Sequence, residues 1–189
     1  MTAGNDGLFK VWDIRDNGYK CALQGKGSDD ALNVATFNNV NRHLIAAAGE
    51  ESGMVGIWDM RMPTMFLNDL AFHTKQVTVA EWHPTKEQTL MTGSDDGKVF
   101  IWDNSKCGEE QARIDYEDGP PEMVFPHMTH NSTIEDVCWS PERGSGLMPF
   151  VASVETQLTL QVWKTKEDFF EDELDQLVNV DKIGLEDLE

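Results

Sequence analysis

The sequence predicts an all-β protein built from repeated four-stranded units, and two recurring motifs support this fold class. The first motif is a β-hairpin that ends in Trp-Asp, most clearly in residues 89–103, TLMTGSDDGKVFIWD. The second is a short alternating strand that precedes each hairpin. The tryptophans that end the hairpins are 46, 44 and 61 residues apart: Trp12, Trp58, Trp102 and Trp163. A period of about 40–45 residues with Trp-Asp endings is typical of the blades of a WD-repeat β-propeller.

The hairpin of residues 89–103 carries the strongest local signal. Asp96-Gly97 favours a tight turn, and Val99 and Ile101 alternate with larger or polar side chains after it. The unit recurs as TAGNDGLFKVWD (2–13), AAAGEESGMVGIWD (46–59) and ASVETQLTLQVW (152–163), with Lys164 where Asp is expected. The strands that precede the hairpins are predicted over residues 32–38, 77–84 and 134–141.

The repeats predict about three complete blades and part of a fourth over residues 1–164. Residues 1–13 supply the last two strands of the partial blade, and residues 14–31 and 60–72 are interpreted as connections. A propeller commonly closes with seven blades of about 40 residues each, so 189 residues hold about half of one. We therefore expect either the C-terminal half of a longer protein or a partner that supplies the other blades.

Several polar residues are predicted to stabilise the blades. His73 and His130 each stand nine residues before a tryptophan, and His73 is expected to link the turn residue Asp96 to Trp102. Ser52 and Gln157 occupy the offset of Asp96 in two other repeats, so those blades are expected to lack this carboxylate. His127 lies three residues before His130, but no further ligand is near enough to predict zinc.

Charge and cysteine content restrict the class of partner and the compartment. The net charge is −19, and most of the excess negative charge falls in residues 104–189. This charge disfavours binding to nucleic acid or anionic membranes and favours basic partners. A role in solubility alone explains the charge equally well. Three cysteines without metal-binding spacing fit a reducing compartment. With no signal peptide or apolar span in the sequence, we expect nuclear localisation, with the cytoplasm as the alternative.

The extra length before the last tryptophan lies in an acidic loop, residues 104–126. Asp118-Gly119-Pro120-Pro121 stiffens the chain, and a long loop in a compact domain is commonly functional. We expect Met123 and Phe125 to supply part of an apolar floor for a basic amphipathic helix, if they are exposed. No nucleophile, phosphate-binding, dinucleotide or metal motif is present, so the sequence predicts neither an enzyme nor a cofactor.

A second acidic segment, residues 165–189, follows the last blade. Phe170, Leu174 and Leu177 have the spacing of one apolar helix face. The sequence predicts a short helical tail, which either packs on the propeller or binds a partner, with disorder as a further alternative.

The run KCGEEQARIDYEDGPPEMVFPHMTHNSTIEDVCWSP resembles the matching segment of the retinoblastoma-binding, Msi-type histone-binding WD-repeat family. The resemblance extends from Thr2 to Trp163, over the C-terminal half of that family's seven-bladed propeller. It implies a non-enzymatic histone chaperone or scaffold in chromatin assembly, deacetylase, Polycomb or remodelling complexes. A generic WD-repeat scaffold, for ribosome assembly or a ubiquitin ligase, is the alternative.

The resemblance also implies which residues contact core histones. In the family the acidic loop forms one wall of a groove that holds a histone helix, and an N-terminal helix without a counterpart here forms the other wall. The loop residues at these positions are Asp115, Glu117, Asp118, Gly119, Pro120, Pro121 and Glu122. Asn33 matches a position on the propeller face that binds basic tails. Other positions of that face differ from the family's acids or aromatic: Ala31, Gln76, Thr78 and Thr156.

Overall fold

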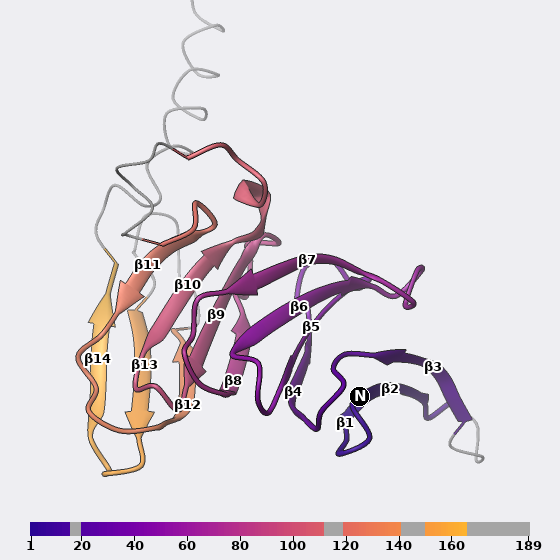
Figure 1. Cartoon of the computed structure of the whole chain (residues 1–189), viewed down its shortest axis with the longest axis horizontal. Helices are drawn as coiled ribbons and strands as arrows, with labels where there is room; N and C mark the ends of the chain where they lie inside the picture. The colour runs from indigo at the N-terminus through magenta and orange to yellow at the C-terminus, as the bar shows by residue number, and fades with distance from the viewer. Residues whose placement is uncertain (16–19, 112–118, 141–149, 166–189) are drawn as a thin grey trace, which may run out of the picture.

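The computed structural model contains four antiparallel sheets that stand side by side like the blades of an open fan (Figure 1). The structure describes residues 1–15, 20–111, 119–140 and 150–165. The first sheet holds β1 (Thr2–Ala3), β2 (Leu8–Asp13) and β3 (Lys20–Lys26). The second holds β4 (Leu32–Phe37), β5 (Leu44–Gly49), β6 (Met54–Asp59) and β7 (Phe66–Ala71).

The other two sheets follow in chain order. The third holds β8 (Val77–Trp82), β9 (Thr89–Ser94), β10 (Val99–Asp103) and β11 (Met123–His127). The fourth holds β12 (Ile134–Trp139), β13 (Phe150–Glu155) and β14 (Leu160–Lys164). A 3-10 turn, η1 (Asn104–Lys106), is the one helical element within the described ranges. The fold is thus an all-β, partial WD-repeat propeller, as the repeats predict.

The number of strands in each blade differs from the prediction. Residues 14–31 and 60–72 are not plain connections, because they contain the outer strands β3 and β7. The described residues therefore form two four-stranded and two three-stranded sheets, instead of three complete blades and two strands of a fourth. The predicted loop 104–126 likewise contains most of a third outer strand, β11. All three strands lie at the outer edge of a sheet, and in β3 and β7 most side chains meet water, so the apolar alternation is weak.

Each hydrophobic cluster fills the space between two neighbouring blades. The first-to-second interface buries Phe9 and Trp58, and the second-to-third buries Ile57, Leu70 and Trp102. Trp163 packs against the cluster between the third and fourth blades. Trp12 faces the open side of the first blade and is 38% exposed, whereas Trp102 is fully buried. A blade is therefore stabilised mainly by the neighbour that covers its tryptophan.

A chain of hydrogen bonds fixes the third blade as predicted from His73 and Asp96. The Trp102 indole N–H donates to Thr92 Oγ1 at 2.8 Å, and the Thr92 hydroxyl lies 2.8 Å from Nε2 of His73. Nδ1 of His73 lies 3.1 Å from Asp96 Oδ2. Burial alone would raise the pKa of Asp96, but His73 and backbone N–H donors lower it to about 2. The Asp96 carboxylate and the His73 imidazole thus support each other inside the blade.

The fourth blade replaces this carboxylate from another position. Trp163 and His130 both bond Ser153 Oγ, at 3.0 and 2.7 Å. Gln157 stands at the offset of Asp96, as the sequence shows, but Glu155 accepts the backbone N–H groups of residues 131 and 132 at 2.8 and 2.9 Å. The expectation that this blade lacks a carboxylate is therefore wrong, because Glu155, two residues earlier, takes that place 3.6 Å from His130 Nδ1.

The predicted C-terminal tail begins where the last described strand ends. β14 ends at Lys164, and Thr165 is buried. The amphipathic helix predicted over the tail lies outside the described residues from 166 onward. Among the described residues, no helix is long and apolar enough to cross a membrane.

Candidate protein-interaction site

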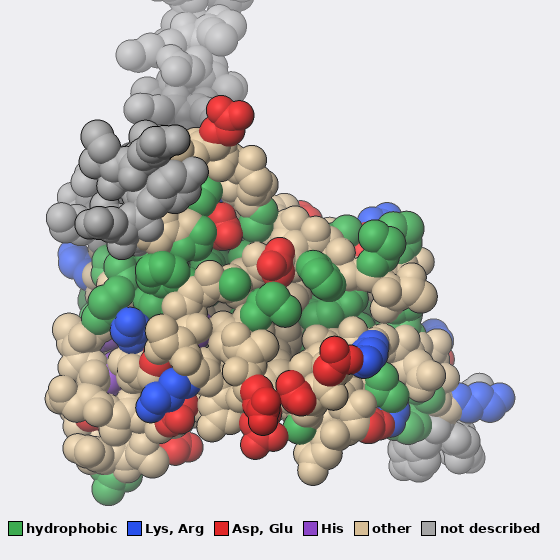
Figure 2. Space-filling model, in the orientation of Figure 1, with side chains coloured by type: hydrophobic (Ala, Val, Ile, Leu, Met, Phe, Trp, Pro, Cys, Tyr) green, Lys and Arg blue, Asp and Glu red, His purple; other side chains and the backbone are tan. Residues whose placement is uncertain are grey.

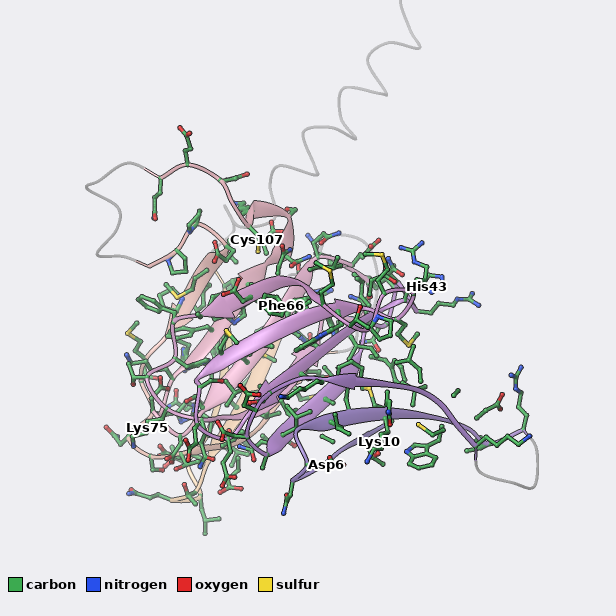
Figure 3. The ribbon with its side chains drawn as sticks, turned by 45° about the vertical axis from the view of Figure 1, so that its right-hand side comes forward. Asp6, Lys10, His43, Phe66, Lys75 and Cys107 are labelled. Atoms are coloured by element: carbon green, nitrogen blue, oxygen red, sulfur yellow. The ribbon has the colours of Figure 1, made fainter. Side chains whose placement is uncertain are left out.

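The acidic loop connects β10 to β11 at the outer side of the third blade. It begins at η1, whose first turn is capped by Asp103 accepting the Ser105 N–H at 3.0 Å. Cys107 follows η1 and marks the base of the loop in Figure 3. Three of the predicted binding residues, Asp115, Glu117 and Asp118, lie outside the described residues.

The two ends of the loop are held together. The Gln111 side-chain amide donates to the carbonyl of Gly119 at 2.8 Å, and the Met123 N–H donates to the carbonyl of Pro120 at 2.9 Å. Gly119 has a φ of 110°, and a Cβ atom there would lie 2.3 Å from Met123 Cε. The positive φ therefore favours glycine at this position of the Pro–Pro turn. The described part of the predicted set, Gly119 to Glu122, forms this fixed base.

Carboxylates from two blades gather around Cys107 at the base of the loop. Burial raises the pKa of the Cys107 thiol to about 11, with further contributions from Glu122, Asp69 and Asp103. Asp69 lies on β7 of the second blade, which is tied to the loop by an Asn68–Asn104 hydrogen bond of 2.7 Å. Burial is the largest cause of this rise, and the three carboxylates near Cys107 add a negative field. Such a site attracts cationic side chains and offers them charge-assisted hydrogen bonds.

Met123 and Phe125 do not form the exposed apolar surface that was expected beside the acidic loop. Met123 is only 8% exposed and packs in the cluster between the second and third blades, and Phe125 stacks on Trp163 at 5.4 Å. Strand β11 points both side chains into blade interfaces, so the expectation was wrong. The exposed apolar side chains near the loop instead belong to β7, at Phe66 and Leu67, just before Asn68.

Asn33 lies apart from the acidic loop, on the innermost strand of the second blade (Figure 1). Its side-chain amide donates to Gln76 Oε1 at 3.1 Å and to the Val77 carbonyl at 3.3 Å. Thr78 makes the corresponding bond one blade further, donating to the Ile134 carbonyl at 2.5 Å. Asn33 therefore links neighbouring blades, and the structure does not bring it together with the loop residues.

Sequence reasoning missed the contribution of Asp69 to this site. Asp69 is far from the loop in sequence, and the segment containing it was interpreted as a connection. Asp103 was visible only as the end of a Trp-Asp motif. Within the described ranges, no group of three or more His, Cys, Asp or Glu side chains is arranged to hold a metal ion. The carboxylates of Asp69, Asp103 and Glu122 thus form an acidic edge at the base of the loop.

Comparisons with known proteins agree with the propeller fold. Residues 1–161 match the family described as "Nucleolar protein 10-like, N-terminal domain". The chain is 28% identical over 146 residues to "Histone acetyltransferase type B subunit 2" of Debaryomyces hansenii, covering 74% of this chain and 35% of that protein. It is 34% identical over 175 residues to "WD-40 repeat-containing protein MSI3" of Arabidopsis thaliana, and the match covers 91% of this chain and 39% of that protein. The similarity to Msi-type WD-repeat proteins expected from the acidic loop is thereby confirmed.

A solved structure shows the same fold at low sequence identity. A chain of "Crystal Structure of Mitotic Checkpoint Complex" superposes with a TM-score of 0.66 and 19% identity, over 86% of this chain and 43% of that one. The present chain spans 35–39% of the length of the two curated relatives.

Proposed function

We propose that this chain, which belongs to the Nucleolar protein 10-like, N-terminal domain family, is a non-catalytic WD-repeat scaffold or chaperone subunit that binds core histones. The acidic loop holds a basic histone helix, and the other subunits of the complex belong to chromatin assembly, deacetylase, Polycomb or remodelling machinery. Its place of action is the nucleus. The similarity to a protein named as a histone acetyltransferase subunit supports this proposal.

The observation that carries the proposal is the negative field at the base of the loop. Glu122, Asp103 and Asp69 act together on Cys107, whose pKa burial and these carboxylates raise to about 11. The hydrogen bond from Gln111 to Gly119 fixes both ends of the segment that contains Asp115, Glu117 and Asp118. A loop anchored in this way loses less conformational freedom on binding.

The physical basis of recognition is pairing of arginine or lysine with these carboxylates. Arginine binds a carboxylate through two parallel hydrogen bonds, which adds geometric selectivity to charge attraction. Long-range attraction speeds encounter and weakens as salt screens it. Affinity for a basic helix should therefore depend on loop charge and on ionic strength together.

The proposal is tested by titrating a core-histone dimer into the wild-type chain and Asp118→Lys, at low and at physiological salt. We expect Asp118→Lys to weaken binding by about 1–3 kcal/mol while its thermal unfolding stays almost unchanged, because exposed charges contribute little to stability. Glu135→Lys, an equal charge change at an exposed position on β12, is the matched control. Equal affinities of the wild type and Asp118→Lys, or binding that ignores salt, would contradict the proposal.

A second candidate function is that of a WD-repeat scaffold in ribosome assembly, which the nucleolar description of the matching family favours. A scaffold of a ubiquitin ligase is a further example of such a generic WD-repeat interaction protein. An array of histone and non-histone peptides separates these functions. Selective capture of basic histone segments supports histone binding. Capture of acidic or degron-like peptides supports a generic scaffold.

A further inference from the structure

The second blade lacks the side chains that fill the third blade around its tryptophan. In the third blade, His73 stacks on Phe100 at 4.3 Å and bonds Thr92 at 2.8 Å. Strand register places Ala47 at the position of Thr92 and Gly56 at that of Phe100. Ser28 precedes β4 by the same offset by which His73 precedes β8. Three space-filling side chains are thus replaced by small ones at one place in the second blade.

A cavity of about 190 Å³ opens where these side chains are missing. It lies between the first two blades, and its lining includes Lys26, Ser28, Asp29, Gly56, Trp58 and Phe66. The volume is several times the roughly 30 Å³ that a water occupies, yet below the roughly 300–1,000 Å³ of a drug-sized site. It fits one large side chain of a partner.

Trp58 and Phe66 make the cavity apolar and leave it open to solvent on one side. The Trp58 ring lies over the Gly56 backbone, since a Cβ atom on Gly56 would be 2.2 Å from the ring. Trp58 is 2% exposed, and its ring is backed by Phe9 at 5.4 Å. Phe66, which is 49% exposed, meets Trp58 edge-on at 6.2 Å and forms the rim. Figure 3 shows Phe66 on β7, in the outer strand of the second blade.

The cavity also offers a hydrogen-bond donor. The indole N–H groups of Trp12, Trp102 and Trp163 each donate to a hydroxyl on the neighbouring strand. Ala47 stands at that position beside Trp58, so the neighbouring strand offers the Trp58 indole no hydroxyl. A carbonyl of a bound peptide can accept a hydrogen bond from this N–H.

The loops at the mouth of the cavity carry an excess of carboxylates. Lys26 pairs with Asp29, and Asp30 follows in the same loop. The turn that contains Glu50 and Glu51 is tied to this loop, because the Glu50 N–H donates to the Ala31 carbonyl at 2.8 Å. Acidic side chains gather along the lower edge of the molecule in Figure 2, where these loops lie in Figure 1. The mouth therefore favours lysine or arginine beside the inserted side chain.

We propose that this cavity is a second docking site, which takes a linear basic peptide with one aromatic or large aliphatic anchor residue. The anchor lies against Trp58 and Phe66, and the flanking basic residues face the carboxylates of Asp29, Asp30, Glu50 and Glu51. The site is on the flank between the first two blades and uses none of the residues of the acidic loop.

The test uses fluorescence polarisation of the full chain with a labelled peptide of sequence Gly-Arg-Lys-Phe-Arg-Gly. A peptide with Ser in place of Phe, and one with Glu in place of all three basic residues, are the ligand controls. We expect the Phe peptide to bind at least about tenfold more tightly than either control. Phe66→Ser should weaken this binding at least about fivefold. Leu67→Ser, the adjacent exposed position on β7, should leave it unchanged.

Ser28→His provides a second variant, because it restores the side chain that fills the third blade. It should abolish binding of the Phe peptide while the circular dichroism spectrum and the thermal midpoint stay as in the wild type. If Ser28→His does not fold, the comparison of Phe66→Ser with Leu67→Ser decides the matter. Equal binding of the Phe and Ser peptides, equal effects of the two β7 variants, or no binding at millimolar peptide would each overturn the proposal.

Discussion

Replacing Trp102 and Trp12 separately by alanine measures how much a neighbouring blade stabilises its partner. Both indoles donate to a threonine hydroxyl ten residues earlier, Trp102 to Thr92 at 2.8 Å and Trp12 to Thr2 at 3.0 Å. Trp102 is fully buried between the second and third blades, whereas Trp12 is 38% exposed on an open face. The two tryptophans therefore differ mainly in whether a neighbouring blade buries the indole ring.

The expected magnitudes follow from buried area and cavity formation. Full burial of a tryptophan removes roughly 200 Å² from water, which is worth about 5 kcal/mol at about 25 cal/mol per Å². Alanine retains part of this, so Trp102→Ala should cost about 3–5 kcal/mol, in the range of core aromatic truncations. Trp12→Ala leaves no enclosed cavity and loses less buried area, so about 1–2 kcal/mol is expected.

Urea unfolding of the full chain, followed by far-ultraviolet circular dichroism, measures both losses. Trp58→Ala, with 2% exposure, should behave like Trp102→Ala. Equal losses for Trp12→Ala and Trp102→Ala would show that interblade burial does not control stability. A loss below about 1 kcal/mol for Trp102→Ala would mean that this tryptophan is not a blade core.

Three further predictions concern acid stability, the field at the loop, and its preorganisation. Folding lowers the pKa of Asp96 from 3.8 to about 2, so this carboxylate stabilises the folded state by about 2 kcal/mol above pH 4, and the stabilisation is lost as the pH falls toward 2. The thermal midpoints of the wild type and Asp96→Asn should therefore converge as the pH falls from 4 to 2. A constant difference between the two midpoints would contradict the role given to Asp96. Glu122→Gln should lower the pKa of Cys107 and speed its alkylation at alkaline pH, measured by mass spectrometry, whereas Glu109→Gln should not; equal rates in both would contradict the field at the loop base. Replacing Pro120 and Pro121 by glycine should weaken histone binding in calorimetric titrations less than Asp118→Lys does, through lost preorganisation, and a larger loss would show that the prolines make direct contacts.

The blade cores were predictable because their signals are local. The Asp96-Gly97 turn, the alternation that follows it and the terminal Trp102 lie within one hairpin. The role of His73 is predictable from its offset, because related contacts recur around Trp102 and Trp163. Strands β3 and β7 escaped prediction because an outer strand has one neighbour and a mostly exposed surface, so its apolar pattern is broken.

The features that sequence could not give depend on contacts between distant segments. Glu155 replaces the missing turn carboxylate because its strand register brings it to His130, not because of its offset from Trp163. Asp69 reaches the loop base from another blade. The sequence leaves open whether Met123 is exposed, and the pairing of β11 with β10 places its side chain in the core. In each case the packing of blades decides the outcome.

Site-specific photo-cross-linking at position 110 tests histone recognition by the loop most directly. A photoreactive residue replaces Glu110, which is exposed in the loop and leaves the predicted binding residues intact, in one variant, and Met128, which is 51% exposed just beyond the far end of β11, in a matched one. After irradiation with a core-histone dimer, we predict a cross-link from position 110 to a histone helix that diminishes with salt, and none from position 128. Equal cross-linking from the two positions, or none from position 110 at saturating histone, would contradict the account.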